Sequence, residues 1–503
     1  MGWKKDYPET EWPKWKPNSS GYQTGAKCTY AGGAWRAAFY APGDKKPGEG
    51  DPNYNGWRPV DEIYDDPDNT SKVPPFTGQS NVVVYLPTWR GDEYLKNTEQ
   101  FKYMTHGLIS FVTVRDKKDG TLDATSVKDV EKALAAFDKP AREQGVKLMF
   151  ALGGANDLAF NELMAIGGKD PGDAAFLKLA EQVANFCKSK KFDGVDLDLE
   201  CWWAMNGQAD RGGRFSDDEA GRAAAKAAGT PDKVGPDLAG KGLVEFAKKL
   251  REHLGDDMVL SAAVMATSWY GSDYDGAGLA KYCDWIGIMS YDFTGSWNAS
   301  PVGPHTLTYR CPPEKLEERY GAEQQNDWPH KNDPCQKGPA ADNPVLSVED
   351  SLWYWTFKPY TNWQGTGQKA DRKKFGVGVP VYGYDFSYEK DEDPVTGDKP
   401  PGYKVLRWSE ILKDFPDAES KNPPNIKVEG ATARPPFLHC VPGEYRYKHN
   451  IWYETPATAT EKIKFTRELG LSTVIVWEAS NDVWDDHSIL KAVYKASGNP
   501  PKG

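Results

Sequence analysis

The sequence predicts an α/β protein: a (β/α)8 TIM barrel with a small all-β module at its N-terminus. Eight short apolar runs of the buried-strand type recur along residues 80–498, and amphipathic stretches lie between or beside several of them. An open, doubly wound sheet has the same alternation. Eight units over roughly 420 residues favour the closed barrel. Residues 1–63 lack a helical period and are dense in Trp, Tyr, Gly and Pro, which indicates short strands between turns.

The spacing of apolar residues predicts the individual elements. The predicted strands are 81–86, 107–114, 147–152, 194–199, 258–265, 285–291, 375–382 and 473–477. The predicted helices are 123–144, 173–190, 243–253 and 458–469. The carboxyl ends of the eight strands meet at one face of a barrel, which is where such barrels build active sites.

Two connections at that face are too long to be simple loops. Residues 293–350 follow the sixth strand, and residues 384–453 follow the seventh. Long ordered insertions are more often functional than neutral, and the second is long enough to form an α+β subdomain. The polar, Pro-bearing residues 64–79 predict a linker between the module (1–63) and the barrel (80–498).

Composition excludes several classes of protein. The net charge of −11 argues against nucleic-acid binding and against anionic membrane surfaces. No apolar run approaches the ~20 residues of a membrane span, and the first residues, MGWKKDYPET, contain no signal-peptide core. The 19 Trp and 25 Tyr suit a polysaccharide enzyme, because sugar rings pack on aromatic faces; a large core would account for them equally.

The cysteines do not fix the compartment. Cys311 and Cys335 flank a polar loop and are candidates for a disulfide in an oxidising compartment. The spacings match no zinc pattern, and an odd count leaves at least one free thiol or an intermolecular bond. The seven positions are 28, 187, 201, 283, 311, 335 and 440.

The strongest chemical signal is the run FDGVDLDLE at residues 192–200. Side chains alternate along a strand, so Asp196, Asp198 and Glu200 share one face, which in a barrel is the interior. Two carboxylates about 6 Å apart repel by roughly 3 kcal/mol at an effective dielectric near 20. Shared protons relieve this repulsion, and a neutral acid beside an ionised one is what glycosidic cleavage needs.

Three acids on one strand face also fit two different roles. They could bind a divalent metal ion, or they could be a solvated strand face. The apolar residues that flank them argue against the solvated face.

These acids also carry a resemblance. Asp193, Asp196, Asp198 and Glu200 resemble the DxxDxDxE signature of family 18 glycoside hydrolases, the chitinase family. Three further elements occur in matching order along residues 80–498. They are ALGG at 151–154, similar to SxGG; Met289, Tyr291 and Asp292, similar to MxYD; and Trp477, similar to the tryptophan that floors the sugar site.

The resemblance implies a substrate-assisted, retaining mechanism without metal or cofactor. Glu200 would be the general acid and base, and Asp198 would orient the substrate's acetamido group. Asp196 would take part in proton sharing, Tyr291 would hydrogen-bond the acetyl group, and Asp292 would hold the sugar. Without the resemblance, a packed aromatic with a satisfied hydroxyl would be the favoured interpretation of Tyr291.

The chain departs from the family pattern at several positions. Ala151 stands where a serine usually bonds the inner aspartate, so Tyr85 is expected to carry that task alone. Leu199 and Cys201 replace aromatics beside the glutamate, and Ala155 replaces a tryptophan. Substrate contacts are expected from Met289, Tyr85 and Trp477, and from tryptophans after strand ends whose alternative is ordinary packing: Trp89, Trp202, Trp203, Trp269 and Trp297.

The N-terminal module resembles family 5/12 carbohydrate-binding modules. Because a domain of about 60 residues has a thin core, some of its aromatics are expected on the surface, with Trp35, Tyr40 and Trp57 contacting chitin. A structural cap on the barrel is the alternative. The positions that carry the resemblance are Trp15, Tyr22, Gly25, Tyr30, Trp35, Ala38 and Trp57, with Phe39 and Tyr40 as the aromatic doublet.

Together these features predict a secreted, monomeric chitinase that acts on chitin and chitooligosaccharides. An endo-β-N-acetylglucosaminidase acting on N-glycans uses the same chemistry and is the first alternative. A chitin-binding lectin or toxin-complex subunit on the same barrel is the second. Lectins of this family lose the catalytic glutamate, so the presence of Glu200 argues against the lectin.

Overall fold

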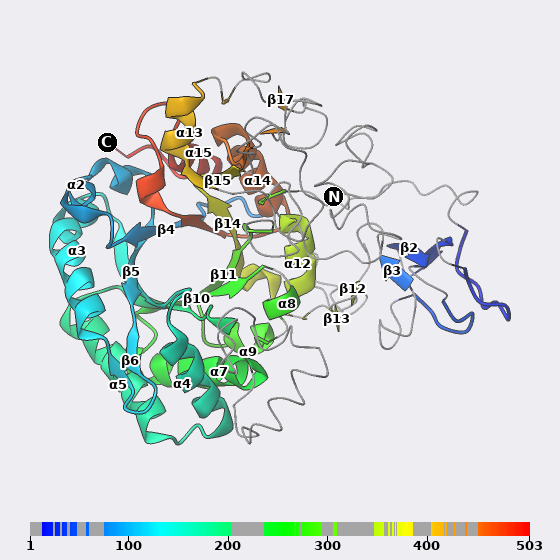
Figure 1. Ribbon diagram of the computed structural model, residues 1–503, viewed down its shortest axis with the longest axis horizontal. Helices are drawn as coiled ribbons and strands as arrows, with labels where there is room; N and C mark the ends of the chain where they lie inside the picture. The colour runs from blue at the N-terminus through cyan, green and yellow to red at the C-terminus, as the bar shows by residue number, and fades with distance from the viewer. Residues whose placement is uncertain are drawn as a thin grey trace, which may run out of the picture.

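Eight parallel strands close into a barrel in the order β4, β5, β8, β9, β10, β11, β14 and β20, with β20 paired to β4 (Figure 1). The computed structural model describes residues 13–23, 26–30, 33–37, 41–47, 57–59, 75–202, 236–266, 268–271, 273–293, 305–308, 347–356, 361–362, 365–366, 368, 370–385, 404–416, 418–419, 427–428, 438–439 and 451–502. The barrel strands are Asn81–Pro87 (β4), His106–Val112 (β5), Lys147–Gly153 (β8), Gly194–Asp198 (β9), Val259–Met265 (β10), Trp285–Met289 (β11), Phe375–Pro380 (β14) and Thr473–Trp477 (β20). The predicted TIM barrel is confirmed.

Helices α2, α3, α4, α5 and α7 lie outside the barrel strands (Figure 1). The α-helices are Gly91–Leu95 (α2), Ala124–Glu143 (α3), Leu158–Lys169 (α4), Ala174–Ser189 (α5), Pro236–Leu254 (α7), Ser268–Gly271 (α8), Gly276–Leu279 (α9), Val348–Thr356 (α12), Trp408–Asp414 (α13), Pro456–Glu468 (α14) and Ile489–Ala496 (α15). Short 3-10 helices are Glu99–Tyr103 (η1), Arg372–Lys374 (η6) and Ala479–Asn481 (η7). All four predicted helices are present, and α7 begins earlier than the expected 243.

Helix α3 shows how sequence sets these helices. Asp123 caps its N-terminus, because its carboxylate accepts hydrogen bonds from the backbone N–H groups two and three residues later. Val130, Ala133, Phe137 and Ala141 recur at helical spacing and are buried. The apolar stripe thus packs on the barrel while the polar faces stay in water.

Strand β9 places acids and apolar residues on opposite faces, as the alternation predicts. Val195 and Leu197 are buried in the apolar layer between strands and helices. Asp196 points to the interior, in register with Ala151 of β8 on one side and Ser261 of β10 on the other. A buried carboxyl group is thereby flanked by one methyl group and one hydroxyl group.

The strand ends differ from prediction in several places, among them the sixth strand, β11, which ends at Met289 rather than at 291. The run 107–114 divides into β5 and β6 (Val114–Asp116), and β6 pairs with β7 (Thr121–Leu122) in a separate hairpin. Tyr382 begins β15 (Tyr382–Asp385), which pairs with β16 and β19 outside the barrel. β9 ends at Asp198, so Glu200 lies two residues beyond the strand rather than at its last position.

Two three-stranded antiparallel sheets form outside the barrel sheet. In the segment after β14, β15 pairs with β16 (Lys404–Arg407) and β19 (Ile451–Tyr453). Near the N-terminus, β1 (Lys27–Tyr30), β2 (Gly33–Ala37) and β3 (Trp57–Pro59) form a three-stranded sheet. The remaining short strands pair as β12 (Thr361–Asn362) with β13 (Gly365–Thr366), and β17 (Lys427–Val428) with β18 (Leu438–His439).

Cysteines and helix hydropathy add two facts. Cys28, Cys187 and Cys283 are buried free thiols, and Cys201 is also buried. Cys311, Cys335 and Cys440 lie outside the described residues, as does the bridge predicted between the first two. Within the ranges given above, no helix combines the length and apolar character that crossing a membrane requires.

Candidate active site

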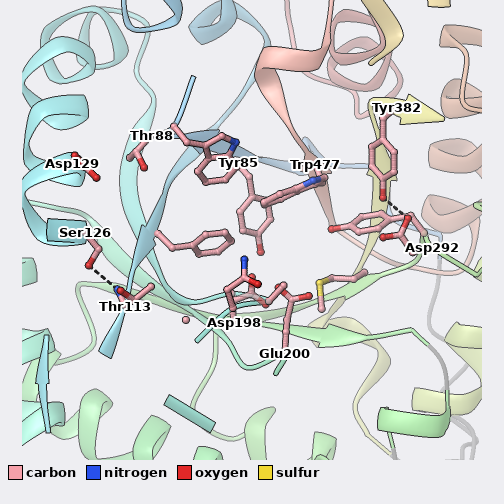
Figure 2. A pocket seen from close by; sticks show the side chains of 18 residues that line it. Tyr85, Thr88, Thr113, Ser126, Asp129, Asp198, Glu200, Asp292, Tyr382 and Trp477 are labelled. Atoms are coloured by element: carbon pink, nitrogen blue, oxygen red, sulfur yellow. Dashed lines mark hydrogen bonds between the residues drawn. The ribbon is translucent and has the colours of Figure 1, made fainter. Parts of the chain in front are cut away.

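A cavity of about 680 Å³ opens at the carboxyl ends of the barrel strands. It unites residues from distant parts of the chain, and Figure 2 shows Asp198 and Glu200 side by side at its floor, below the ring of Tyr85. The predicted site residues that line it are Tyr85, Trp89, Asp198, Glu200, Met289, Tyr291, Asp292 and Trp477.

Asp196 lies in the barrel interior, next to Asp198 on β9, and is 2% exposed. Its Oδ2 accepts a hydrogen bond from the Tyr85 hydroxyl (3.0 Å), and its Oδ1 accepts one from Ser261 Oγ (2.6 Å). Burial raises the pKa of Asp196 to about 6, and the two hydrogen bonds oppose that rise. Tyr85 therefore does not hold this carboxyl alone, contrary to the prediction. Ser261 shares the task from the strand opposite Ala151.

Asp198 and Glu200 form a coupled pair above Asp196. Burial raises the pKa of Asp198 well above its usual value, and the charges of Glu200 and Asp196 raise it further. Burial also raises the pKa of Glu200 to about 7, while its hydrogen bond with Asp198 lowers it. Asp198 Oδ1 has no other hydrogen-bond partner among the described residues. Near neutral pH, the pair holds at least one proton that it can give away.

The double glycine at the end of β8 allows this arrangement. Gly153 has φ +110°, and a Cβ atom there would lie 2.1 Å from the carbonyl oxygen of Asp198. Gly154 donates its N–H to the same oxygen at 2.8 Å. This hydrogen bond satisfies the Asp198 carbonyl at the end of β9, and Glu200, two residues later, lines the cavity.

Asp292 lies across the cavity from the β9 acids (Figure 2). Its Oδ1 accepts hydrogen bonds from the hydroxyls of Tyr382 (2.6 Å) and Tyr384 (2.9 Å), and His305 Nδ1 lies 3.5 Å away. None of these three partners was predicted. The tyrosines directly follow the seventh strand, a signal that could have found them. His305 lies inside a long connection that has no comparable signal.

Tyr291 and the aromatic residues shape the cavity walls. The Tyr291 ring packs against Gly378, where a Cβ atom would approach its Cε1 to 2.6 Å. The ring of Trp477 lies 5.8 Å from Phe111 and 6.1 Å from Trp89, and Trp89 stacks on Phe111 with an interplanar angle of 11°. Trp89 is 50% exposed, so it presents a free aromatic face at the rim. Phe111 was not predicted.

Trp202 is not a subsite residue, contrary to prediction. It is 1% exposed, and its Nε1 donates to the Tyr274 hydroxyl at 3.0 Å. The backbone bond from Trp202 N to Glu200 O (2.6 Å) turns the chain inward. Of the other candidates, Trp203, Trp297 and the side chain of Trp269 lie outside the described residues.

The structure also corrects the prediction for the N-terminal module. Trp35 and Trp57 are buried, and their Nε1 groups donate to the backbone carbonyls of Tyr30 (3.0 Å) and Lys45 (3.2 Å). Burial of both rings gives this small sheet a core, so neither is free to contact a polymer surface. Tyr40 lies outside the described residues.

Asp193, the first acid of the signature, has a structural position. Its Oδ2 accepts a hydrogen bond from Leu148 N at 2.7 Å and pairs with Arg142. It joins the starts of β8 and β9, far from the cavity end of the strands. In the described part of the chain, no group of three or more His, Cys, Asp or Glu side chains is arranged to hold a metal ion.

The geometry agrees with comparisons to known proteins. The model of glycosyl hydrolases family 18 matches residues 81–482. The chain belongs to this family. Probable chitinase 10 of Drosophila melanogaster is 22% identical over 444 residues, which cover 84% of this chain and 16% of that protein. Endochitinase of Manduca sexta is 23% identical, over 75% of this chain and 58% of that protein. The chain thus spans less than two thirds of the length of these relatives.

Solved structures of a chitinase domain and of a pseudo-chitinase share the fold. Catalytic domain 2 of the group II chitinase of Ostrinia furnacalis aligns with a TM-score of 0.56 and 20% identity, over 85% of this chain and 98% of that one. Human YKL-39, described as a pseudo-chitinase that retains chitooligosaccharide binding, aligns with a TM-score of 0.53 and 16% identity over 84% of this chain and all of that one. Both hydrolysing and non-hydrolysing proteins therefore have this fold.

Proposed function

We propose that this chain is a chitinase that hydrolyses β-1,4-linked N-acetylglucosamine polymers with retention of configuration. The coupled acids at the cavity floor carry the proposal, because the raised pKa values of Asp198 and Glu200 keep a proton available near neutral pH. Glycosidic cleavage requires such a donor. The family and the Ostrinia furnacalis domain solved with an N-acetylchitooligosaccharide support chitin oligomers as the substrate class.

In the proposed reaction, Glu200 gives its proton to the glycosidic oxygen as the bond from that oxygen to the anomeric carbon breaks. The carbonyl oxygen of the substrate's own acetamido group attacks the anomeric carbon and forms an oxazolinium ion. Asp198, next to Glu200, orients the acetamido group and stabilises its positive charge. Glu200 then takes a proton from water as the water oxygen bonds to the anomeric carbon. The bond from that carbon to the acetamido oxygen breaks, which opens the oxazolinium ring and restores the original configuration.

The deeper groups support this step. Tyr85 and Ser261 hold Asp196 by hydrogen bonds. In the proposed reaction, Asp196 shares a proton with Asp198. Tyr291 lines the same cavity, and we assign its hydroxyl a hydrogen bond to the acetyl group of the substrate. Asp292 is assigned a sugar hydroxyl.

The aromatic residues supply the sugar platform. Trp477 and Trp89 line the cavity and offer flat faces to successive rings, and Met289 lines the same cavity. Aromatic faces bind the apolar sides of sugar rings through contact area rather than direction. We therefore assign these three residues to substrate binding.

One experiment separates this proposal from its alternatives. Wild type and Glu200→Gln are incubated with chitin hexamers and with a high-mannose N-glycan, and the products are identified by mass spectrometry. Release of short chitooligosaccharides by wild type alone supports a chitinase, and glycan release alone supports an endo-β-N-acetylglucosaminidase. Binding of chitin oligomers without turnover by wild type would show a lectin and overturn the proposal.

Chitin binding by residues 1–63 and export from the cell are further parts of the proposal. Tethering would hold the barrel at an insoluble surface and raise its effective concentration there. Since Trp35 and Trp57 are buried, Tyr40 is the predicted contact that is left to test. Loss of chitin pull-down in Tyr40→Ala, with Leu177→Ala at an exposed apolar position of α5 as the control in the barrel, would support the module's role.

A further inference from the structure

His305 is fully buried behind Asp292, and both of its ring nitrogens face oxygen atoms. Nε2 lies 3.2 Å from the backbone carbonyl oxygen of Tyr382, and Nδ1 lies 3.5 Å from Asp292 Oδ1. A carbonyl oxygen only accepts hydrogen bonds, so the contact with Tyr382 places a proton on Nε2. The state of Nδ1 then decides the charge of the ring.

A neutral ring with its proton on Nε2 would turn the lone pair of Nδ1 toward the carboxylate. Nδ1 is buried and has no closer partner among the described residues, so such a ring would leave two acceptors facing each other. We infer that His305 is an imidazolium ion that pairs with Asp292, and that it positions the Asp292 carboxylate for the sugar. The positioning role rests on the proposed function; the charge of the ring does not.

The ring is held where it stands by bonds on both sides. The backbone of His305 accepts a hydrogen bond from Phe293 N at 3.0 Å. The next residue, Thr306, donates to the carbonyl of Ser290 (2.9 Å) and accepts from Lys462 Nζ (2.6 Å). These bonds fix the backbone that carries the ring against β11 and α14, and the rings of Tyr382 and Tyr384 pack against the imidazole.

The ionisable groups around the ring leave one anion for its charge. Tyr382 and Tyr384 flank it with ring centroids at 5.0 Å, and both of their hydroxyls donate to Asp292. Lys462 pairs with Glu454, and both are buried, so these two charges compensate each other. In the described structure, Asp292 is therefore the partner that a buried imidazolium requires.

This pairing matters for the acid on the other side of the cavity. The charge of Asp292 raises the pKa of Glu200, in addition to the larger effect of burial. An imidazolium behind Asp292 offsets part of that charge. With Oδ1 of Asp292 used by His305 and two phenols, Oδ2 is the oxygen available to a sugar hydroxyl. Loss of the imidazolium should weaken sugar binding and move the alkaline limb of the activity profile to higher pH.

The charge is tested directly by nitrogen NMR of the chain labelled at its seven histidines. The His305 signals are assigned by their absence from His305→Gln. We expect two protonated ring nitrogens at neutral pH, each with a directly bonded proton. A ring with one bare nitrogen at neutral pH would overturn the inference whether or not the chain hydrolyses chitin.

The positioning role is tested by the kinetics of His305→Gln on chitin oligomers. We expect KM to rise roughly tenfold, as for loss of a charged hydrogen bond, with a smaller change in kcat and an alkaline limb shifted to higher pH. His487→Gln, at an exposed histidine paired with Glu419, is the control and should match wild type. If His305→Gln has the melting temperature of wild type and the alkaline limb of its activity profile is not shifted, the positioning role is contradicted. Inactive wild type would instead overturn the proposed function, and the NMR result would stand.

Discussion

Both sides of the cavity use an aspartate, but the two aspartates differ in how many hydrogen-bond donors surround them. On the β9 side, Asp198 Oδ1 has no hydrogen-bond donor among the described residues, and burial raises the pKa of both Asp198 and Glu200. Across the cavity, Asp292 Oδ1 accepts from two phenol hydroxyls, with His305 behind it. The first side holds carboxyls that keep protons, and the second holds a carboxylate with one oxygen, Oδ1, already bonded by the protein.

This contrast suggests how the site divides its work. A buried acid with few donors gains by staying protonated, so it is suited to giving a proton away. A carboxylate that is held by several donors gains by staying in place, so it is suited to binding. Replacing residues on each side should therefore change different kinetic constants.

Removing the partner of Glu200 should have the largest effect. Asp198→Ala deletes the group assigned to stabilise the oxazolinium charge, and we expect kcat to fall about 10²- to 10³-fold. Burial raises the pKa of Glu200 and the hydrogen bond from Asp198 lowers it, so the alkaline limb should also move up. Steady-state rates on chitin hexamers across pH measure both effects. A fall in kcat of less than threefold would contradict the role of Asp198.

Asp196 should lower the free energy of unfolding at neutral pH. Burial raises its pKa from 3.8 to about 6, so between these values the folded chain keeps a proton that the unfolded chain has lost. The stability from this proton is complete below about pH 4 and is lost as pH rises through 6, by at most about 3 kcal/mol. Asp196→Asn should remove this loss and gain stability relative to wild type at pH 7 but not at pH 4. Denaturant unfolding at the two pH values measures it, and equal differences at both would contradict the assignment.

Loss of the Ser261 hydroxyl should lower kcat by about a factor of ten. Ser261→Ala removes the 2.6 Å bond to Asp196 and leaves that oxygen unsatisfied in the interior. Because this bond opposes the effect of burial, its loss raises the pKa of Asp196 further. Ala151 flanks Asp196 from the other strand. We therefore expect Ala151→Ser to restore most of the kcat that Ser261→Ala loses. No rescue in the double variant would show that the hydroxyl acts only by packing.

The acid side and Asp292 could be predicted from sequence, and the residues that hold Asp292 could not. Alternation along one strand is a local property, so the order of Asp196, Asp198 and Glu200 already determined which face they share. The partners of Asp292 come from two long connections, and their meeting depends on how these return to the barrel. Nothing local places His305 there.

Burial explains the wrong assignments in the same terms. Trp202, Trp35 and Trp57 have the residue type that sugar platforms use, but an aromatic ring is also the largest group available to fill a core. Which use applies depends on the path of the chain after the strand, as with the turn between Glu200 and Trp202. The barrel strands other than β9 could be predicted because a buried parallel strand is largely apolar on both faces, a pattern that needs no tertiary information.

The smallest expected effects concern the two phenols on the binding side, and they test whether this side binds rather than reacts. Tyr382→Phe and Tyr384→Phe each remove one donor to Asp292 Oδ1, at 2.6 and 2.9 Å. We expect each variant to raise KM about three- to fivefold, the larger change belonging to the shorter bond, with kcat nearly unchanged. Initial rates on chitin hexamers separate the two constants. If either variant lowers kcat and leaves KM alone, Asp292 takes part in the reaction step, and the division between proton-holding and sugar-holding sides is wrong.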